Sequence, residues 1–323
     1  MKKKRIFVVG GVAGGASCVA RARRLSETHD IIMFDRGEYV SFANCGLPYY
    51  VGDVIKEEEN LIVATPEMFR KRFKIDVRLQ SEVVAVDRKN SRIQIKDLTT
   101  GDIYLEEYDA LVLAPGARAI KPKMPGIDLP GIFSLRTIPD SRQIKGWING
   151  RNAKRAVVVG GGYIGMEMTE NLVNLGLSVT IIEMQPHVMP LLDAEMASPI
   201  TAELVKHGVT LRLNETVTGF EQNEDGSIST KLKSGGIERA GIVILALGVR
   251  PEIKIAEAAG LEIGERGGIR VDKHMRTSDE KIWAVGDAVE VKDVVTGQWS
   301  VIPLAGPANR QGRIAADVIM GRN

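Results

Sequence analysis

Cysteine and histidine are scarce in this chain. Its 323 residues include 2 cysteines and 4 histidines, and the spacing of these residues matches no metal site. Two cysteines cannot build a disulfide framework, which secreted domains of small size often need. We therefore expect a reducing, cytoplasmic environment and no bound metal.

An excess of one charge and a long apolar run are also missing. The 43 basic and 41 acidic residues give a formal net charge of +2, which excludes the electrostatic footprint of a nucleic-acid or anionic-membrane partner. Behind the basic MKKKR start, glycines interrupt the apolar stretch IFVVGGVAGGA, which is typical of a strand entering a phosphate loop. No run approaches the roughly 18 apolar residues of a membrane span. The length suits two globular domains.

A repeat organises the chain. IFVVGGVAGGASCVARARRL near the N-terminus and AVVVGGGYIGMEMTENLVNL in the middle both read as strand, glycine turn and helix. A second strand follows each and ends in an acid, Asp35 or Glu183, which lies 25 or 23 residues after the first glycine, Gly10 or Gly160. This spacing is typical of a dinucleotide-binding βαβ unit, so we predict an α/β fold with two Rossmann-like domains.

The second loop, GGGYIG, satisfies G-x-G-x-x-G. Gly160 makes the tight turn, Gly162 lets the backbone approach a pyrophosphate, and Gly165 lets the helix pack on the strand. Glu183 would accept a hydrogen bond from the ribose 2′-hydroxyl of NADH and repel the 2′-phosphate of NADPH, so we expect NADH, with NADPH as the alternative. The first loop, GGVAGG, departs from the pattern at Val12. A glycine turn of an unrelated α/β fold is the competing interpretation.

The rest of the chain reads as mixed α and β. TPEMFRKRF predicts a helix; IDVRL, EVVAVD and KIWAVGDAVEV predict strands; and SRIQIKDLTTGDIYLEEYDALVLAPGA predicts the end of an antiparallel meander. ALVLAPGA and IVILALGVRP end in glycine turns that indicate crossings between domains. Two dinucleotide units suggest a flavin and a nicotinamide. We therefore predict a FAD-binding domain in two parts, 1–118 and 250–323, around an NAD(P)-binding domain at 119–249.

Four features together resemble the FAD-dependent pyridine nucleotide-disulfide reductases: the N-terminal loop, SFANCG, GGGYIGME and TSDEKIWAVGDAVEV. The resemblance runs from Ile6 to about Ile319. The single cysteine of SFANCG places the chain among the coenzyme A-disulfide reductases (CoADR), NADH oxidases, NADH peroxidases and NADH-dependent polysulfide reductases. It implies a glutathione-reductase-like fold in which each domain has a central parallel sheet and an antiparallel meander.

The resemblance also implies site residues. Cys45, Tyr163 and Glu167 match the catalytic positions, with Tyr163 as an aromatic gate over the nicotinamide pocket. The positions that match cofactor contacts are Gly10, Ala13, Gly14, Gly15, Asp35, Arg36, Asn44, Val83, Ala114, Pro115, Gly116, Arg136, Gly160, Gly162, Ile164, Gly165, Glu183, Gly248, Gly286, Asp287, Pro303, Leu304 and Ala305. The positions that match CoA contacts are Ser17, Arg21, Arg24, Ser41, Asn44, Lys71 and Asn309.

Cys45 lacks the usual partner. Two-cysteine members of the superfamily have a second cysteine five residues on, where this chain has Tyr50. Cys45 must therefore exchange with an external sulfur or cycle through a sulfenic acid. Pro48 and the residues after it predict a helix beginning just after Cys45, whose N-terminus would favour the thiolate. The competing interpretation makes Cys45 a packing residue, which is our reading of Cys18.

Ala13 bears on the oxidant. NADH oxidases and peroxidases of this group carry a histidine there, whereas coenzyme A-disulfide reductases have a small residue, as here. Arg21 and Arg24 lie three residues apart, so both could clamp a 3′-phospho-ADP from one helix face, unless that face is merely solvated. Phe73 stands where the family has a lysine contact, which weakens this part of the match.

The resemblance implies that electrons pass from NAD(P)H through FAD to Cys45, which forms a mixed disulfide with CoA and reduces CoA disulfide, CoA persulfide or polysulfide. One alternative is an NADH oxidase or peroxidase that uses a Cys45 sulfenic acid. Another is a non-catalytic FAD- and NAD-binding redox sensor or interaction module. The chain ends at VIMGRN, where relatives continue into a C-terminal dimerisation domain, so we expect that domain to be absent. Full-length relatives form homodimers.

Overall fold

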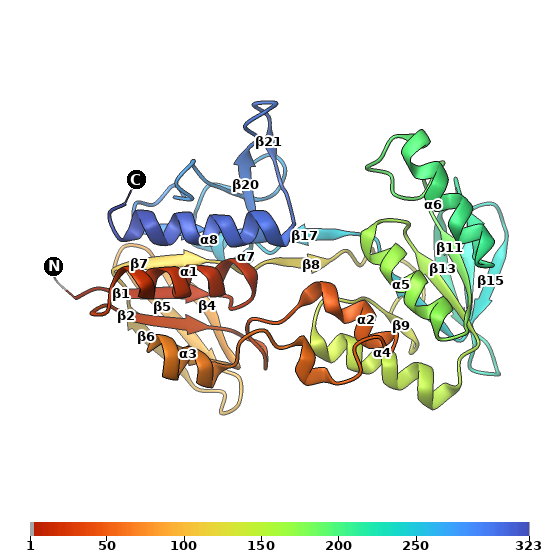
Figure 1. The fold of residues 1–323 in the computed structure, drawn as a ribbon, viewed down its shortest axis with the longest axis horizontal. Helices are drawn as coiled ribbons and strands as arrows, with labels where there is room; N and C mark the ends of the chain where they lie inside the picture. The colour runs from red at the N-terminus through yellow and green to blue at the C-terminus, as the bar shows by residue number, and fades with distance from the viewer. Residues whose placement is uncertain (1–2, 323) are drawn as a thin grey trace. The chain divides into compact units, whose positions relative to one another are not determined.

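Two compact units make up the chain. The structure, a computed structural model, describes residues 3–322 (Figure 1). Unit 1 contains the described residues up to Phe42, Ile62–Arg118 and those from Arg250 onward, and unit 2 contains Ala43–Leu61 and Ala119–Val249. The chain therefore crosses between units after 118 and 249, and also around 43–61. The predicted domains are defined by the cofactor each binds, and that assignment stays a prediction.

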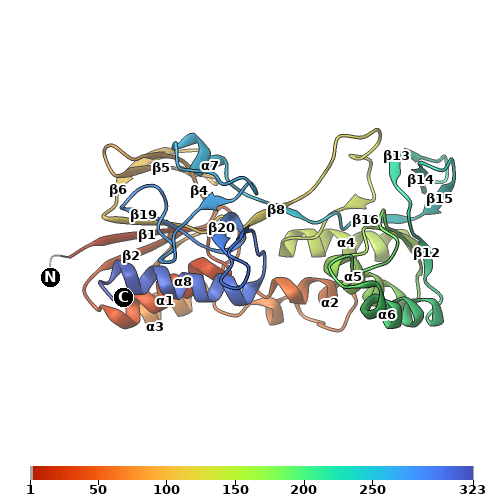
Figure 2. The same cartoon turned by 90° about the horizontal axis from the view of Figure 1, so that it is seen from above.

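Unit 1 is built on a parallel sheet with the strand order β19-β7-β1-β2-β3. Figure 2 shows α1, α3 and α8 on one face of this sheet and the meander β4-β5-β6 on the other. The elements of unit 1 are β1 (Arg5–Val9), α1 (Ala13–Leu25), β2 (Asp30–Phe34), α3 (Pro66–Phe73), β3 (Asp76–Arg78), β4 (Ser81–Asp87), β5 (Arg92–Asp97), β6 (Ile103–Glu107), β7 (Ala110–Leu113), α7 (Lys254–Ala258), β18 (Ile269–Arg270), β19 (Ile282–Ala284), the 3₁₀ turn η3 (Gly286–Ala288), β20 (Val289–Lys292), β21 (Trp299–Ser300) and α8 (Ala305–Ile319).

The central strands of unit 1 are continuously apolar because both faces of the sheet are covered. Ile6, Phe7 and Val8 of β1 have no exposed surface, and all four residues of β7 are buried. β1 lies between β2 and β7 in parallel register, which brings the carboxyl ends of these strands to one edge. That edge carries the first glycine loop.

Helices α1 and α8 lie side by side (Figure 1) because small residues let them approach closely. A Cβ added to Gly312 of α8 would lie 2.2 Å from the carbonyl oxygen of Gly14 and 3.1 Å from the backbone nitrogen of Cys18, both in α1. The Cys18 side chain is fully buried in this core, as predicted. The helix that leaves the first glycine loop is therefore held by the C-terminal end of the chain.

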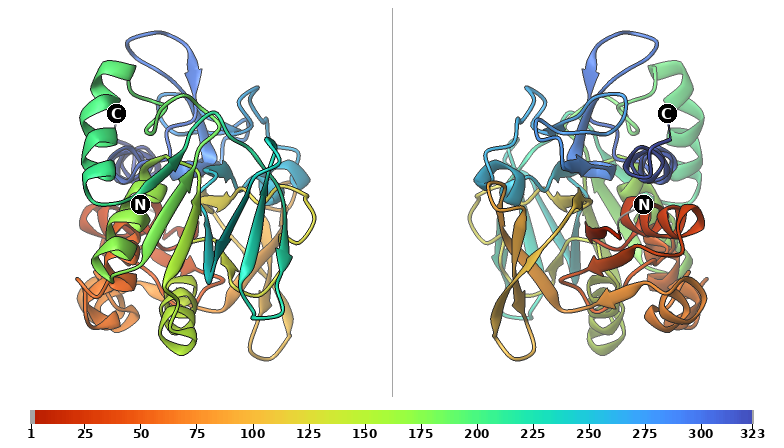
Figure 3. Two further views of the ribbon diagram at one scale, coloured as in Figure 1. Left: turned by 90° about the vertical axis from the view of Figure 1, so that its right-hand side faces the viewer. Right: turned by 90° about the vertical axis from the view of Figure 1, so that its left-hand side faces the viewer.

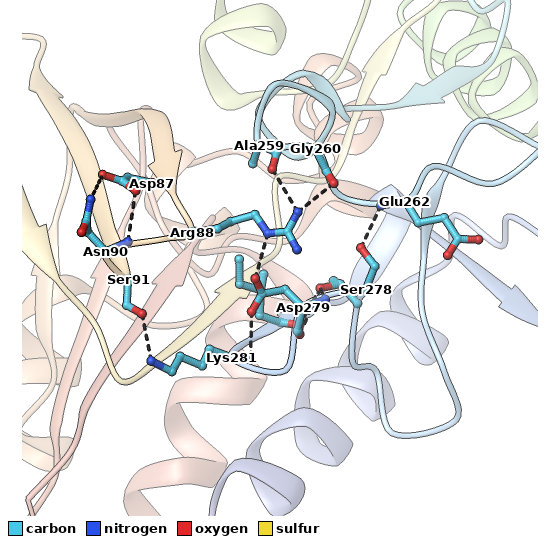
Figure 4. A network of polar contacts seen from close by, with 12 residues as sticks. Asp87, Arg88, Asn90, Ser91, Ala259, Gly260, Glu262, Ser278, Asp279 and Lys281 are labelled. Carbon is cyan, nitrogen blue, oxygen red and sulfur yellow. Dashed lines mark hydrogen bonds and ion pairs between the residues drawn. The ribbon is translucent and has the colours of Figure 1, made fainter.

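A polar network joins the meander to the later part of unit 1 (Figure 4). The Arg88 guanidinium, just after β4, donates to the Asp279 carboxylate at 2.8 Å and to the Gly260 carbonyl oxygen at 2.8 Å. Lys281 donates to the Ser91 hydroxyl at 3.0 Å. These bonds join two segments of unit 1 that lie about 190 residues apart in sequence.

One predicted strand is wrong. KIWAVGDAVEV forms β19 and β20, which belong to different sheets. Gly286 interrupts the run with φ of 85°, a left-handed conformation that favours glycine. Its N–H donates to the Gln311 side chain at 2.7 Å in place of a strand partner. Gly286–Ala288 therefore forms a 3₁₀ turn between the two strands, with the extended Val285 at its N-cap.

Unit 2 repeats the plan of unit 1, with a parallel sheet of order β12-β11-β10-β16-β9 and the antiparallel meander β13-β14-β15 (Figure 3). Its elements are η1 (Asn44–Gly46), α2 (Leu47–Val51), η2 (Glu58–Leu61), β9 (Ile132–Phe133), α4 (Ile138–Arg151), β10 (Arg155–Val159), α5 (Tyr163–Asn174), β11 (Ser178–Ile182), α6 (Ala194–Lys206), β12 (Thr210–Arg212), β13 (Val217–Gln222), β14 (Ile228–Leu232), β15 (Ile237–Ala240) and β16 (Ile242–Leu245). At the crossings, β8 (Ala117–Ala119) pairs with β17 (Val249–Pro251). The predicted pair of Rossmann-like sheets, each with a meander, is confirmed.

In residues 3–322, no helix combines the length and the hydropathy needed to cross a bilayer.

Gly312→Ala tests the contact between α1 and α8. The new methyl group would press on backbone atoms of α1, which cannot move aside, so we expect the free energy of unfolding to fall by about 1–3 kcal/mol. Gly306→Ala is the matched control, because a Cβ at Gly306 in the same helix meets nothing within 4 Å. Denaturant unfolding of both variants checks this, and equal stability of the two would contradict the proposed contact.

Candidate functional site

The first glycine of each loop has the same geometry in both units. Gly10 and Gly160 have φ of 98° and 107°. A Cβ on either would lie 2.0 or 2.3 Å from the carbonyl oxygen of Ala114 or Ala246, respectively. The neighbouring strand of each sheet therefore leaves no room for a side chain, and the fold itself requires these two glycines.

The last glycine of each loop is also required by packing. A Cβ on Gly15 would lie 1.8 Å from the carbonyl oxygen of Gly10, and a Cβ on Gly165 would lie 2.1 Å from that of Gly160. These contacts set the helix directly against the end of the strand, as the fingerprint predicts. Both loops thus share the same strand-to-helix turn.

Gly162 differs from the other loop glycines. A Cβ at this position would meet nothing within 4 Å, so the packing of unit 2 does not require glycine here. A glycine that the fold does not need fits a loop whose backbone is approached closely by a ligand phosphate. In unit 1 the same place is taken by Val12, which precedes the first residue of α1 and is half-buried.

The helices that leave the loops begin without a side-chain cap. Neither α1 nor α5 has a side-chain hydrogen bond at its N-cap, whereas α3 and α4 are capped by Thr65 and Thr137. The N-termini of α1 and α5 are therefore open, as are those of α2, α6, α7 and α8. The free N–H groups of α1 and α5 fit the pyrophosphate of a dinucleotide, so the residues of both loops suit the expected cofactors.

Asp35 ties the first loop to the end of β2. Its two carboxylate oxygens accept hydrogen bonds from the N–H of Gly11 at 2.8 Å and of Gly37 at 2.7 Å. Burial raises the pKa of Asp35, and these two donors partly offset that effect. The carboxylate predicted to meet a ribose thus also holds the loop in place.

Glu183 does the same in unit 2. Its oxygens accept from the N–H of Gly161 at 2.6 Å and of Gln185 at 2.9 Å, and its side chain is buried. Each carboxylate oxygen can accept a second hydrogen bond, so the expected bond to a ribose hydroxyl remains available. The two acids therefore occupy equivalent positions in the repeat.

The other predicted cofactor positions fall into three groups. Gly116, Gly248 and Gly286 have positive φ at strand ends. Val83 is buried in the core of unit 1, so its side chain packs against protein. The remaining predicted positions in unit 1 are Ala13, Gly14, Arg36, Pro115, Asp287, Pro303, Leu304 and Ala305, and those in unit 2 are Asn44, Arg136 and Ile164. Whether each contacts a cofactor stays a prediction.

Cys45 is exposed, and a helix follows it, as predicted. It is the middle residue of η1, and α2 begins at Leu47 with Pro48 in its first turn. The neighbouring Asn44 has a buried Oδ1 that has no hydrogen-bond partner among the described residues. A buried acceptor without a donor costs free energy unless a ligand or water supplies one. Residues 43–61, which carry Cys45 and are called the thiol segment below, therefore fit a site that binds a ligand.

Lys145 of α4 holds the thiol segment. Its Nζ lies 2.7 Å from Asp53 Oδ1 and 4.2 Å from the ring centroid of Tyr50. Tyr50 stands at the position where two-cysteine relatives have the second cysteine. In this chain the residue at that position makes a cation–π contact with Lys145. Sequence patterns did not indicate Lys145, because it lies in a distant helix.

Two further contacts fix the segment within unit 2. The Arg142 guanidinium donates to both oxygens of Glu58, at 2.9 and 2.7 Å. A Cβ on Gly52 would lie 2.1 Å from the side-chain oxygen of Asn171 in α5, so the backbone of the segment touches that helix. The segment that carries Cys45 therefore packs against α4 and α5 of unit 2.

Tyr49 lies with the predicted catalytic residues. The negative charge of Glu170 raises its pKa, with smaller contributions from burial, Glu167 and Cys45. Burial, with Glu170 nearby, also raises the pKa of the Glu167 carboxyl. The structure therefore brings both Cys45 and Glu167 within electrostatic reach of Tyr49. Tyr49, four residues after Cys45, was missed from the sequence, although that spacing places it one helical turn on.

Tyr163, the predicted gate, is the first residue of α5 and is 55% exposed. Glu167 lies one turn further along the same helix. Both therefore lie at the open N-terminus that fits the second dinucleotide.

Several predicted CoA positions lie together on α1 and α8. The Ser17 hydroxyl donates to the Asn309 side chain at 2.7 Å. Arg21 forms an ion pair with Asp317 at 2.8 Å, so its charge is already partly compensated. Arg24 stacks over Phe73, 5.9 Å from the ring centroid. Phe73, which replaces a family lysine, thus serves as a platform for an arginine.

Ser41 and Lys71 come from other segments of unit 1. Ser41 has a left-handed backbone with φ of 48°, and its N–H donates to the Gly11 carbonyl oxygen at 2.8 Å. Lys71 is exposed on α3. Their contacts with CoA stay predictions.

Lys145→Met tests the mounting of Cys45. Loss of the Asp53 ion pair and the Tyr50 contact removes about 1 kcal/mol locally, so amide exchange at Gly52, Val54 and Ile55 should rise roughly fivefold. These three amides bond to Pro48 and Tyr49 within the segment. Hydrogen exchange with mass spectrometry measures the change.

Lys206→Met is the matched control, because among the described residues Lys206 forms an ion pair only with Glu203 of its own helix, at 3.2 Å. It should leave exchange in 47–55 unchanged. Unchanged exchange in Lys145→Met would show that Lys145 does not hold the segment.

Comparisons with known proteins agree with this geometry. The sequence profile described as pyridine nucleotide-disulphide oxidoreductase matches residues 4–312. An NAD(P)H sulfur oxidoreductase (CoA-dependent) of Pyrococcus abyssi is 37% identical over 99% of this chain and 70% of that protein. An NADH oxidase of Methanocaldococcus jannaschii is 36% identical over 98% of this chain and 70% of that protein.

Among solved structures, reduced CoADR-RHD of Bacillus anthracis superposes with a TM-score of 0.97 and 49% identity. That match covers 100% of this chain and 58% of the solved chain, so this chain spans less than two thirds of that neighbour.

Proposed function

Because this chain belongs to the pyridine nucleotide-disulphide oxidoreductase family, we propose that it passes electrons from NAD(P)H to a sulfur substrate through Cys45. It is a flavoprotein oxidoreductase, since FAD and NAD(P)H are the cofactors of the family. The observation that carries the proposal is an exposed Cys45, with Tyr50 in place of a second cysteine and with Tyr49 within electrostatic reach of both Cys45 and Glu167.

Two separate sets of residues would bind the two cofactors. The Gly10 loop, the open start of α1 and Asp35 would hold FAD, while Gly162, the start of α5 and Glu183 would hold the nicotinamide dinucleotide. Bound FAD supplies two-electron transfer between a nicotinamide and a thiol or disulfide. The Glu183 carboxylate favours NADH, because a 2′-phosphate there would meet a negative charge.

Cys45 performs the sulfur chemistry. Its thiolate attacks one sulfur of a CoA disulfide, so that the Cys45–CoA bond forms as the original sulfur–sulfur bond breaks and one CoA leaves as thiolate. Two electrons that originate from NAD(P)H then cleave the mixed disulfide, returning the Cys45 thiolate and a second CoA. Each departing CoA thiolate takes up a proton, and the raised pKa values of Tyr49 and Glu167 favour the protonated forms of these two side chains.

The substrate class is CoA disulfide, CoA persulfide or polysulfide. Ser17, Arg21 and Asn309 lie on one surface of α1 and α8, where they fit the phosphorylated end of CoA. The names of the Pyrococcus and Bacillus relatives support this class.

An NADH oxidase that cycles through a Cys45 sulfenic acid is the runner-up, and the Methanocaldococcus relative bears that name. Ala13 argues against it, because a methyl side chain cannot donate or accept the protons of peroxide chemistry. The predicted cytoplasmic location and the homodimer of full-length relatives remain proposals for this chain.

Non-reducing mass spectrometry tests the proposal. After incubation of the purified protein with CoA disulfide, we expect one CoA adduct per chain, on Cys45, and none in Cys45→Ser. Cys18→Ser is the matched control and should keep the adduct. Cys18 is fully buried, and burial raises its pKa to about 12, so it stays protonated and unreactive at neutral pH.

NADH-dependent release of CoA thiol should follow the same pattern. It should vanish in Cys45→Ser and stay near the wild-type rate in Cys18→Ser. An intact Cys45 without adduct, together with oxygen consumption equal to NADH oxidation, would instead support the oxidase. Turnover unaffected by Cys45→Ser would refute both.

A further inference from the structure

The turn η3 of unit 1 is held by a side chain of α8. The Gly286 N–H donates to Gln311 Oε1 at 2.7 Å, and Gln311 is buried. One residue earlier the backbone still pairs with the sheet, because the Val285 N–H donates to the Leu113 carbonyl oxygen at 2.9 Å. Gln311 therefore replaces the sheet as hydrogen-bond partner at the residue where the chain leaves it.

The hydrogen bond, and not packing, fixes Gly286. A Cβ on this residue would come within 4 Å of only one atom, the Ala308 Cβ at 3.8 Å, which is ordinary contact. Gly286 is buried, so its N–H would have no partner without Gln311, and an unpaired buried donor costs free energy. The conformation of η3 therefore depends on the Gln311 side chain.

Asp287 is the residue that this turn exposes. Every other residue of 282–290 is buried, whereas Asp287 is half-buried. An ionised carboxylate has only acceptor atoms, so it suits a ligand that donates, such as a chain of hydroxyl groups. The turn thus brings one acceptor side chain to the surface of an otherwise closed segment.

The same turn adjoins the first glycine loop. A Cβ on Gly14 would lie 2.9 Å from Val285 Cγ2 and 3.4 Å from the Ala308 carbonyl oxygen. Gly14 belongs to the first turn of α1, whose N-terminus is open. In FAD the ribityl chain is bonded directly to the pyrophosphate, so the ribityl hydroxyls follow any pyrophosphate that binds at this helix start.

We infer that Gln311 is a positioning residue for FAD, which fixes η3 so that the Asp287 carboxylate can accept hydrogen bonds from the ribityl hydroxyls. Helix α8 can do this because it is itself fixed to α1, where a Cβ on Gly312 would lie 2.2 Å from the Gly14 carbonyl oxygen. A buried side chain that orients a ligand-binding residue raises affinity without touching the ligand. The inference rests on the proposed function only in taking FAD as the cofactor of unit 1.

The test measures FAD affinity rather than turnover. Dilution of the FAD-loaded protein, followed by the fluorescence of the released flavin, gives the dissociation constant. Gln311→Met keeps the length of the side chain and removes the acceptor, so we expect FAD to bind about tenfold more weakly. Asp287→Ala should weaken FAD binding at least as much. Unchanged affinity in either variant would overturn the inference.

The double variant separates positioning from general stability. If Gln311 acts through Asp287, then Gln311→Met should change the FAD affinity of Asp287→Ala by less than about twofold. If the two losses multiply instead, Gln311 acts independently of Asp287 and the inference is wrong. Gly286→Ala, which strains the same turn at φ of 85°, takes the place of Gln311→Met in this comparison if that variant does not fold.

Thr277→Val is the matched control. The Thr277 hydroxyl donates to the Ile282 carbonyl oxygen at 2.8 Å, at the opposite end of β19 from the turn. Valine has the same shape, so this change removes a polar contact of the same strand and leaves η3 intact. FAD affinity should stay at the wild-type value, and a loss equal to that of Gln311→Met would contradict the inference.

The CoA adduct on Cys45 keeps this test apart from that of the proposed function. The adduct should form in Gln311→Met as in the wild type, because residues 43–61 belong to unit 2. Its absence from the wild type would refute the sulfur chemistry, whereas the FAD affinities of the four variants alone decide the role of Gln311.

Discussion

The structure depends on one hydrogen bond that occurs twice: a carboxylate at the end of the second strand accepts the N–H of the residue after the first loop glycine. Asp35 makes this bond with Gly11, and Glu183 makes it with Gly161. The bond joins the loop to a neighbouring strand, so the loop, the helix behind it and the sheet edge are positioned together. A rigid turn with an open helix N-terminus can meet a pyrophosphate without first being ordered, which lowers the entropy cost of binding.

The loop glycines separate what the fold needs from what a ligand needs. Gly10 and Gly160 are pressed against backbone, whereas a side chain at Gly162 would find empty space. A sequence motif gives these positions equal weight, and only the structure distinguishes them. The same reasoning applies to the cysteines: one is sealed in the interface of α1 and α8, and the other is exposed on a mounted segment. Reactivity here follows surroundings rather than residue type.

Much of the fold could be predicted from the sequence because its signals are local. The spacing from glycine loop to acid, the apolar strands and the helix after Cys45 all lie within short stretches. Lys145 and Arg142 could not be found that way, since nothing near them in sequence points to the segment they hold. The break at Gly286 was missed because an apolar run on both sides resembles one strand, while its cause is a side chain 25 residues away.

The thiol segment is an excursion of the chain into unit 2, and this has a consequence for how the protein must assemble. Residues 43–61 leave the ribosome well before α4 and α5, the helices against which they pack. Arg142, the ion-pair partner of Glu58, is synthesised 84 residues after it. Until α4 and α5 have been made, the apolar side chains of residues 43–61 lack their final partners. Packing of this segment on unit 2 must therefore be a late, long-range event with a high loop-closure entropy. For the same reason, a continuous fragment cut at 119 and 249 would lack the reactive sulfur. Unit 2 is complete only when two distant pieces of chain come together.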